Sequence, residues 1–155
     1  MSTDGSALCT SIARATNRAP LPSANAHGVA GRSIDPSGEV GDRVPIHASS
    51  AGRALLAQMS AEERANLYRK IDFTDYSITT PMTPERIEAD LTQAAARGYH
   101  QSYAEYTPDL AGVAMPLTLP ARRLSIVVVG PTSRCLAQRP ALAAILARHV
   151  DALKA

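Results

Sequence analysis

The sequence predicts an α+β (mixed α/β) domain in which helices cover a mainly antiparallel sheet. The chain has 155 residues, which is the size of one domain with a core of its own. Hydrophobic residues make up 45% and charged residues 19% of the chain, a globular composition far from that of disordered proteins. The hydrophobic period changes from helical to alternating after Gly98, so strands follow helices along the chain.

The N-terminal part of the chain carries little periodic signal, and five of the nine glycines fall before Val44. Only short strands are predicted there, at residues 11–15 and 33–34, the second followed by a turn at residues 35–38. We therefore treat residues 1–40 as a poorly defined N-terminal part of the domain and residues 41–155 as its main part.

Small side chains mark the start of the first predicted helix. Residues 44–57 read VPIHASSAGRALLA, and the small side chains in this stretch allow another group to approach the backbone closely. The helix is expected to end near Gln58. The second helix follows a capping box, in which the side chains of Ser60 and Glu63 each accept a hydrogen bond from a free backbone amide. This helix is expected to extend to about Lys70.

Capping signals also define the third helix. Thr83 is its predicted cap, Pro84 lies in the first turn where its missing N–H costs nothing, and Gly98 ends it. A last helix is predicted from about Pro140, because apolar residues recur there at helical spacing. Its apolar face consists of Leu142, Ile145, Leu146, Val150 and Leu153.

Alternating patterns predict three successive strands at residues 99–106, 111–118 and 123–129. Their short connections favour antiparallel pairing. Pro116 indicates an edge or a bulge in the second strand, because proline cannot donate to a strand ladder. The third strand is apolar on both faces and is therefore expected in the middle of the sheet.

Charge and cysteine content exclude several classes of protein. The net charge is +2, and the basic residues are scattered, which argues against a nucleic-acid surface. No run approaches the roughly 18–20 apolar residues of a membrane span, and no signal peptide is visible, so we expect a cytoplasmic protein without membrane contact. Cys9 and Cys135 lie far apart, and the histidines are isolated. Reduced thiols, no metal and no cofactor are expected.

The segment from His47 to Ala51 leaves several interpretations open. A histidine beside serines raises the question of a hydrolytic nucleophile at Ser50, but the sequence has no Gly-x-Ser-x-Gly elbow and no evident orienting group. Free backbone amides at the helix start, flanked by Ser49, Ser50 and Ala51, could instead receive a carboxylate. A purely structural helix cap is the third interpretation.

Glu105 is a lone carboxylate in a predicted strand, between Ala104 and Tyr106. It could serve as a general acid or base, but no partner acid occurs at useful local spacing. We therefore expect it to hold a neighbouring loop through hydrogen bonds or an arginine pair.

Taken together, these motifs resemble the effector-binding domain of the IclR family of bacterial transcription regulators. The resemblance is carried by residues 44–57, 97–99, 105–106, 114–116 and 129–134. It extends from about Gly41 to the C-terminus and thus makes residues 41–155 an IclR-type effector-binding domain. It weakens before Gly41, which leaves the completeness of the sheet open. The resemblance implies a GAF-like fold, homodimers or homotetramers, and a ligand pocket between the sheet and the helices.

By motif, the resemblance implies that seven residues line the pocket. They are Val44, Ser50, Ala51, Ser102, Gly112, Val127 and Val129. Some members of the family carry an acid in place of Ser102 and serines in place of the two valines, so this wall is less polar. We expect a small organic carboxylate with its anionic end near Ser50 and Ala51 and an aromatic or branched body facing the valines. Glyoxylate-like ligands are disfavoured, because an unpaired buried polar group costs about 1–3 kcal/mol.

The resemblance implies a small-molecule effector-binding and oligomerisation domain of a transcriptional regulator, with no catalytic residue. The family places a DNA-binding winged helix before this domain, and nothing in this chain has the length to supply it. We therefore expect contact with DNA only through that missing N-terminal winged helix. Two alternatives remain: a small hydrolase-like enzyme that uses Ser50, His47 or Glu105, and a purely structural dimerisation module.

Overall fold

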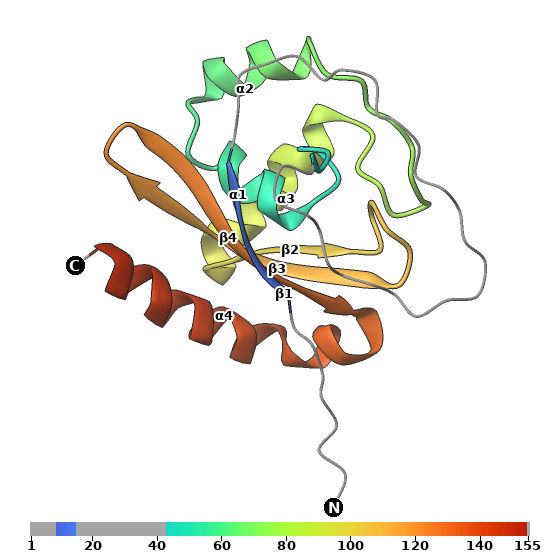
Figure 1. Ribbon diagram of the computed structural model, residues 1–155. Coiled ribbons are helices and arrows are strands. Elements are labelled where there is room, and N and C mark those ends of the chain that lie inside the picture. The colour runs from blue at the N-terminus through green and yellow to red at the C-terminus, as the bar shows by residue number, and fades with distance from the viewer. Residues whose placement is uncertain (1–8, 15–42, 155) are drawn as a thin grey trace, which may run out of the picture.

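The structure is a computed structural model that describes residues 9–14 and 43–154. These residues form the strands β1 (Cys9–Arg14), β2 (His100–Tyr103), β3 (Leu110–Leu119) and β4 (Arg122–Pro131). They also form the helices α1 (Ser50–Leu56), α2 (Ala61–Tyr68), α3 (Pro84–Arg97) and α4 (Thr132–Lys154). The strands make one antiparallel sheet in the order β1-β4-β3-β2 (Figure 1). The predicted α+β fold class is confirmed.

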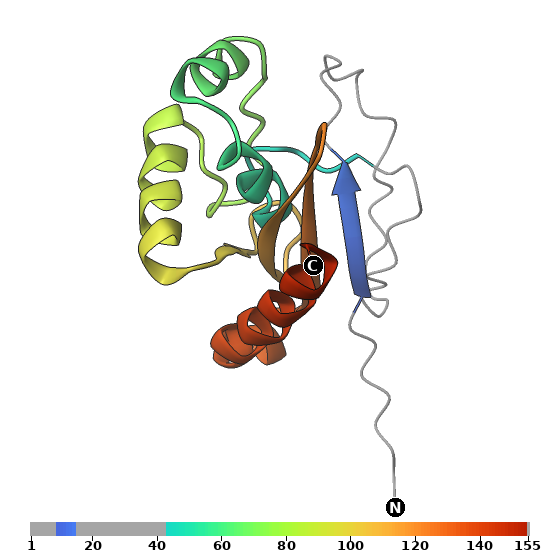
Figure 2. The same ribbon diagram turned by 90° about the vertical axis from the view of Figure 1, so that its left-hand side faces the viewer.

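Helices cover the two faces of this sheet. In Figure 1, α1, α2 and α3 lie above the sheet and α4 lies below it. Figure 2 shows β1 along the edge of the sheet that is farthest from α3. The helix α1 packs against β2, β3 and β4, and α4 packs against β3 and β4. No helix of the described residues combines the length and apolarity needed to span a membrane.

Alternation along the strands divides the core in two. On β3, Val113 and Leu117 pack with α4, whereas Ala114 packs against α1. On β4, Val128 joins the α4 cluster and Val127 joins the α1 cluster. Because β4 has a strand on each side and a helix on each face, both of its faces are apolar, as the sequence predicted.

The predicted helix caps are present. The Ser60 hydroxyl accepts from the Glu63 amide at 3.1 Å, and the Glu63 carboxylate accepts from the Ser60 amide at 2.7 Å. Thr83 caps α3, and Gly98 ends it with a left-handed φ of 88°. These signals are local in sequence, which is why they could be recognised without knowledge of the fold.

The predicted start of the last helix was wrong. We expected it near Pro140, but α4 begins at Thr132 and contains Pro140 in its interior. Proline is favoured in a first turn and costly inside a helix, so local preference pointed to a later start. The additional turns are held by tertiary packing, because Cys135 is buried in the cluster that α4 forms with β3 and β4.

Two strand boundaries also differ from expectation. β2 ends at Tyr103 instead of extending to residue 106, because Ala104 has a left-handed φ of 49° and its amide donates to the Leu110 carbonyl at 2.7 Å. β1 covers residues 11–14 of the strand predicted at residues 11–15 and starts two residues earlier, while residue 15 and the prediction at residues 33–38 lie outside the described residues. Pro116 lies beyond the last residue that pairs with β2, so it does occupy a local edge of β3.

Candidate functional site

The start of α1 approaches the sheet most closely at Gly112. A Cβ atom at Gly112 would lie 2.5 Å from the Ser50 Oγ and 3.0 Å from the Ser102 Oγ. Because 2.5 Å is shorter than any normal contact, only glycine fits beneath the present position of Ser50. Both serine hydroxyls therefore lie next to one backbone position of β3.

Strand register places the remaining predicted residues beside this contact. Ser102 pairs with Gly112, and Gly112 pairs with Val129 on the other side. In the adjacent row, Ala114 pairs with Val127, which packs with Ala51 of α1. Six of the seven predicted residues thus come together on the α1 face of the sheet. The seventh, Val44, is a surface residue with 52% of its area exposed.

The first turn of α1 is capped by its own chain. The Ser49 hydroxyl donates to the Pro45 carbonyl at 2.9 Å and accepts from the Gly52 amide at 3.1 Å. Gly52 itself is required, since a Cβ there would lie 2.1 Å from the Ile46 carbonyl oxygen. One of the amides that the sequence offered to an anion is therefore used inside the protein. The structural-cap interpretation of this serine is confirmed.

His47 has a structural role next to this turn. Its Nε2 lies 3.1 Å from the Thr74 carbonyl oxygen, a hydrogen-bonding distance. Its ring is 5.3 Å from the ring of Phe73 and 5.9 Å from that of Tyr76, measured between centroids. Within the described residues, His47 makes no hydrogen bond to Ser50. The pairing of base and nucleophile that a hydrolase requires is therefore not formed.

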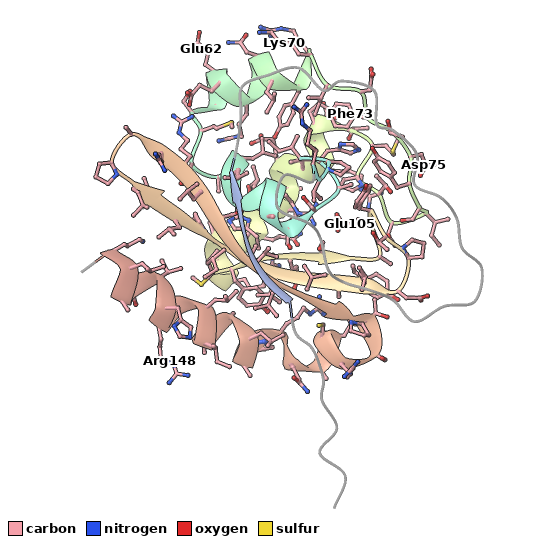
Figure 3. The ribbon with its side chains drawn as sticks, viewed as in Figure 1. Glu62, Lys70, Phe73, Asp75, Glu105 and Arg148 are labelled. Carbon is pink, nitrogen blue, oxygen red and sulfur yellow. The ribbon has the colours of Figure 1, made fainter. Side chains whose placement is uncertain are left out.

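A charge network centred on the buried Arg53 connects the elements that carry the two serines. Arg53 of α1 is only 2% exposed, and its Nη1 and Nη2 donate to the Glu105 carboxylate at 2.7 and 2.8 Å. The same groups donate to the carbonyls of His47 and Gln101. Figure 3 shows Glu105 on the α1 side of the sheet. The expected arginine pair of Glu105 is present, but its partner lies in the helix α1 instead of a loop, and Glu105 lies in the turn after β2 instead of a strand.

The network continues into α3. The Nε of Arg53 lies 2.7 Å from the Oδ2 of Asp90, an ion-pair distance, although the N–H does not point at the oxygen. Arg97 lies 3.7 Å from the other oxygen of Asp90. Two cations and two carboxylates, counting Glu105, therefore balance each other. No local pattern in the sequence indicates this network, because its other members lie 37 to 52 residues from Arg53.

His100 is a further buried polar group on the same face. Its side chain is 6% exposed, and among the described residues its Nδ1 has no hydrogen-bond partner. Burial lowers the pKa of His100 to about 4, although the nearby Asp90 carboxylate opposes the shift. The imidazole is therefore neutral at pH 7 and adds no charge to the Arg53 network.

A groove of about 440 Å³ lies on the opposite face of the sheet, between β4 and α4. Its described lining residues are Ile126, Val128, Ile145, Leu146, His149, Ala152 and Leu153. None of them belongs to the predicted site, because β4 directs alternate residues to opposite faces. Across the described residues, no group of three or more His, Cys, Asp or Glu side chains is placed to hold a metal ion.

Comparison with known proteins defines the class. The sequence profile of the family described as "Bacterial transcriptional regulator IclR C-terminal" matches residues 32–155. This chain belongs to that family, as the motifs at residues 44–57 and 129–134 had suggested. The mixed α+β structure fits the GAF-like fold of these domains.

Individual relatives are regulators rather than enzymes. The transcriptional repressor IclR of Escherichia coli (strain K12) is 33% identical over 100 residues, which cover 63% of this chain and 36% of the repressor. The chain thus corresponds to about a third of that curated relative.

Solved structures share the fold at lower identity. A double mutant of the inducer-binding domain of the Acinetobacter transcription factor PobR, in complex with 3-hydroxybenzoic acid, has a TM-score of 0.71 at 20% identity, and the match covers 94% of this chain and 87% of that chain. The Agobacterium tumefaciens repressor BlcR has a TM-score of 0.69 at 16% identity and covers 76% of this chain and 49% of its own.

Proposed function

We propose that this chain is the effector-binding and oligomerisation domain of an IclR-type transcriptional regulator, and that it senses a small organic carboxylate. The observation that carries the proposal is the meeting of two hydroxyls, Ser50 and Ser102, at Gly112 beside an apolar wall formed by Val127 and Val129. Ligand sites of this kind combine mostly apolar lining with a few converging polar groups.

The chemistry of the wall favours a ligand with one polar end. Both hydroxyls can donate to a carboxylate, whereas the valines offer only apolar surface. The guanidinium of Arg53 is already neutralised by Asp90 and Glu105, so it supplies no net charge for a second anionic group. An aromatic or branched monocarboxylate satisfies these conditions better than a small, fully polar acid. The double mutant of the PobR domain, which shares the fold, is in complex with such an aromatic acid.

The other parts of the proposal concern the whole regulator. Homodimers or homotetramers would bring effector domains together, and DNA would be contacted through a winged helix outside this domain. Support for this comes from the family and from relatives that are named transcriptional repressors. Regulation would then consist of a change in domain arrangement when the effector binds.

The test is a thermal-shift screen of the purified chain. The panel contains benzoate, 3-hydroxybenzoate, isovalerate and glyoxylate. A ligand at 100 times its dissociation constant should stabilise the folded protein by about 2.7 kcal/mol. We expect the aromatic or branched acids to raise the melting temperature and glyoxylate to leave it unchanged.

Two neighbouring valines provide a matched pair of variants. Val127 and Val128 are 4% and 6% exposed, but Val127 faces α1 whereas Val128 faces α4. Val127→Thr and Val128→Thr add the same buried hydroxyl, and we expect only Val127→Thr to weaken the ligand response. A response lost in Val128→Thr alone would move the ligand to the groove beneath α4. A wild-type chain that responds to no acid would contradict the proposal and favour a structural dimerisation module.

A further inference from the structure

Arg53 connects the two elements that carry the serine hydroxyls. The arginine belongs to α1, three residues after Ser50. Its contacts on the other side flank Ser102, because it donates to the carbonyl of Gln101 and to the carboxylate of Glu105. The guanidinium therefore spans from α1 to β2 and to the turn that follows β2. It therefore ties together the two elements whose serine hydroxyls both lie next to Gly112.

The form of these contacts suits a positioning role. The planar guanidinium holds Glu105 through two parallel hydrogen bonds and uses further donors on backbone carbonyls, a geometry that a lysine cannot reproduce. The charges of Arg53 and Arg97 are balanced by those of Asp90 and Glu105, so the cluster is not an anion site. What it supplies is fixed geometry at the edge of the candidate site.

The backbone next to Glu105 has an unusual conformation. Ala104 has a φ of 49°, in the left-handed region that residues other than glycine rarely adopt. The turn is also held from the opposite side, because the Thr80 hydroxyl donates to the Glu105 carbonyl at 2.6 Å. The side chain of Glu105 thus ties a strained turn to α1, while its backbone is tied to the loop around Thr80.

We propose that Arg53 and Glu105 are a positioning pair that holds α1 against β2, so that Ser50 and Ser102 present their hydroxyls to one ligand group. This inference rests on the proposed function for the identity of the site. The positioning itself, however, is a property of the free protein and can be measured without any ligand.

The test is amide hydrogen exchange of Glu105→Gln compared with the unmodified chain. Glutamine keeps the size of the side chain but removes the charge and one of the two strong acceptor positions. We expect the amides of Ser102, Gly112 and α1 to exchange roughly tenfold faster or more, because the local opening free energy falls. The amides of α4 should exchange at their original rates, since α4 packs against β3 and β4 on the other face of the sheet.

A matched control comes from a second bidentate pair. Arg64 donates to both carboxylate oxygens of Glu88 at 2.7 and 2.8 Å and joins α2 to α3. Glu88→Gln should speed exchange around α2 and leave Ser102 and Gly112 unchanged. If Glu88→Gln loosens the serine site as much as Glu105→Gln does, the positioning role is refuted.

A conservative variant separates geometry from charge. Arg53→Lys keeps the positive charge but not the fork, so exchange at Ser102 and Gly112 should still accelerate. Unchanged exchange rates at Ser102 and Gly112 in Arg53→Lys would overturn the inference. Exchange in Glu105→Gln that accelerates equally in α4 and in the serine site would also overturn it. If no acid gives a thermal shift, the proposed function fails, but the exchange results still decide the positioning role. If exchange is unchanged in Glu105→Gln, only the positioning role is refuted.

Discussion

Replacing Gly112 with alanine should destabilise the domain through one identifiable contact. The new Cβ would lie 2.5 Å from the Ser50 Oγ, 3.0 Å from the Ser102 Oγ and 3.6 Å from the Ser50 Cβ. Forcing an extra methyl group into a closed contact costs about 1–3 kcal/mol. Alanine recovers roughly 0.5–1 kcal/mol of backbone entropy that glycine loses in a strand. We therefore expect a net loss of about 1–2 kcal/mol in the free energy of unfolding.

The cause of this loss can be tested with a second substitution. Ser50→Ala removes the oxygen at 2.5 Å and leaves its Cβ at 3.6 Å, an ordinary van der Waals distance. The double variant Gly112→Ala/Ser50→Ala should therefore be more stable than the sum of the two single changes, by about 1 kcal/mol. Urea unfolding of the four proteins in this cycle gives the coupling energy directly. Additive losses would refute the reasoning, because they would show that the conflict is not with the Ser50 hydroxyl.

Three further predictions concern buried groups. Gly52→Ala should lower the free energy of unfolding by more than Gly112→Ala does, by about 3 kcal/mol or above. The reason is that its Cβ would lie 2.1 Å from a backbone carbonyl oxygen, which no side-chain substitution can remove. An unchanged urea midpoint in Gly52→Ala would contradict this prediction. The pKa of His100 is lowered from 6.5 to about 4 in the folded protein, so its contribution to stability is present above pH 6.5 and is lost as the pH falls toward 4. Urea unfolding between these pH values should show a slope of up to about 1.4 kcal/mol per pH unit that His100→Gln removes, and equal slopes in both proteins would argue against it. Cys135 is 1% exposed, and burial raises the pKa of its thiol. In a Cys9→Ser variant, which leaves Cys135 as the single cysteine, Ellman's reagent should therefore react only after unfolding. Fast reaction of the native protein would contradict the burial of Cys135.

The parts of the fold that follow from local rules could be predicted from the sequence. The capping box at Ser60 and the left-handed glycine at Gly98 depend on neighbouring residues, and both were recognised. The start of α4 could not be recognised in this way, because Pro140 argues locally against a helix that the burial of Cys135 stabilises from a distance. The left-handed Ala104 gave no signal either, since alanine has no preference for that conformation.

The candidate site shows the same division between local and distant information. Periodicity alone indicated only a helix start rich in small residues, and the family resemblance supplied the seven pocket residues. The structure adds how six of them meet, through the register that pairs Ser102, Gly112 and Val129. The Arg53–Glu105 pair depends on two residues 52 positions apart, and only their contact in the folded chain reveals it.

The closed contact at Gly112 also limits where an effector can lie. A methyl group at Gly112 does not fit beneath the present position of the Ser50 hydroxyl, so no part of a ligand can pass between β3 and the start of α1 at this point unless that hydroxyl or the helix moves. Under the proposed function, the polar end of the ligand therefore meets the hydroxyls from the side and its body lies over the partly buried Val129, whereas contact with Val127 requires α1 to move, because Val127 packs against Ala51 and Ala54. A ligand that enters at Gly112 instead must push α1 away from the sheet. In that case Arg53, which is bound to both elements and to α3, would carry the displacement across the domain.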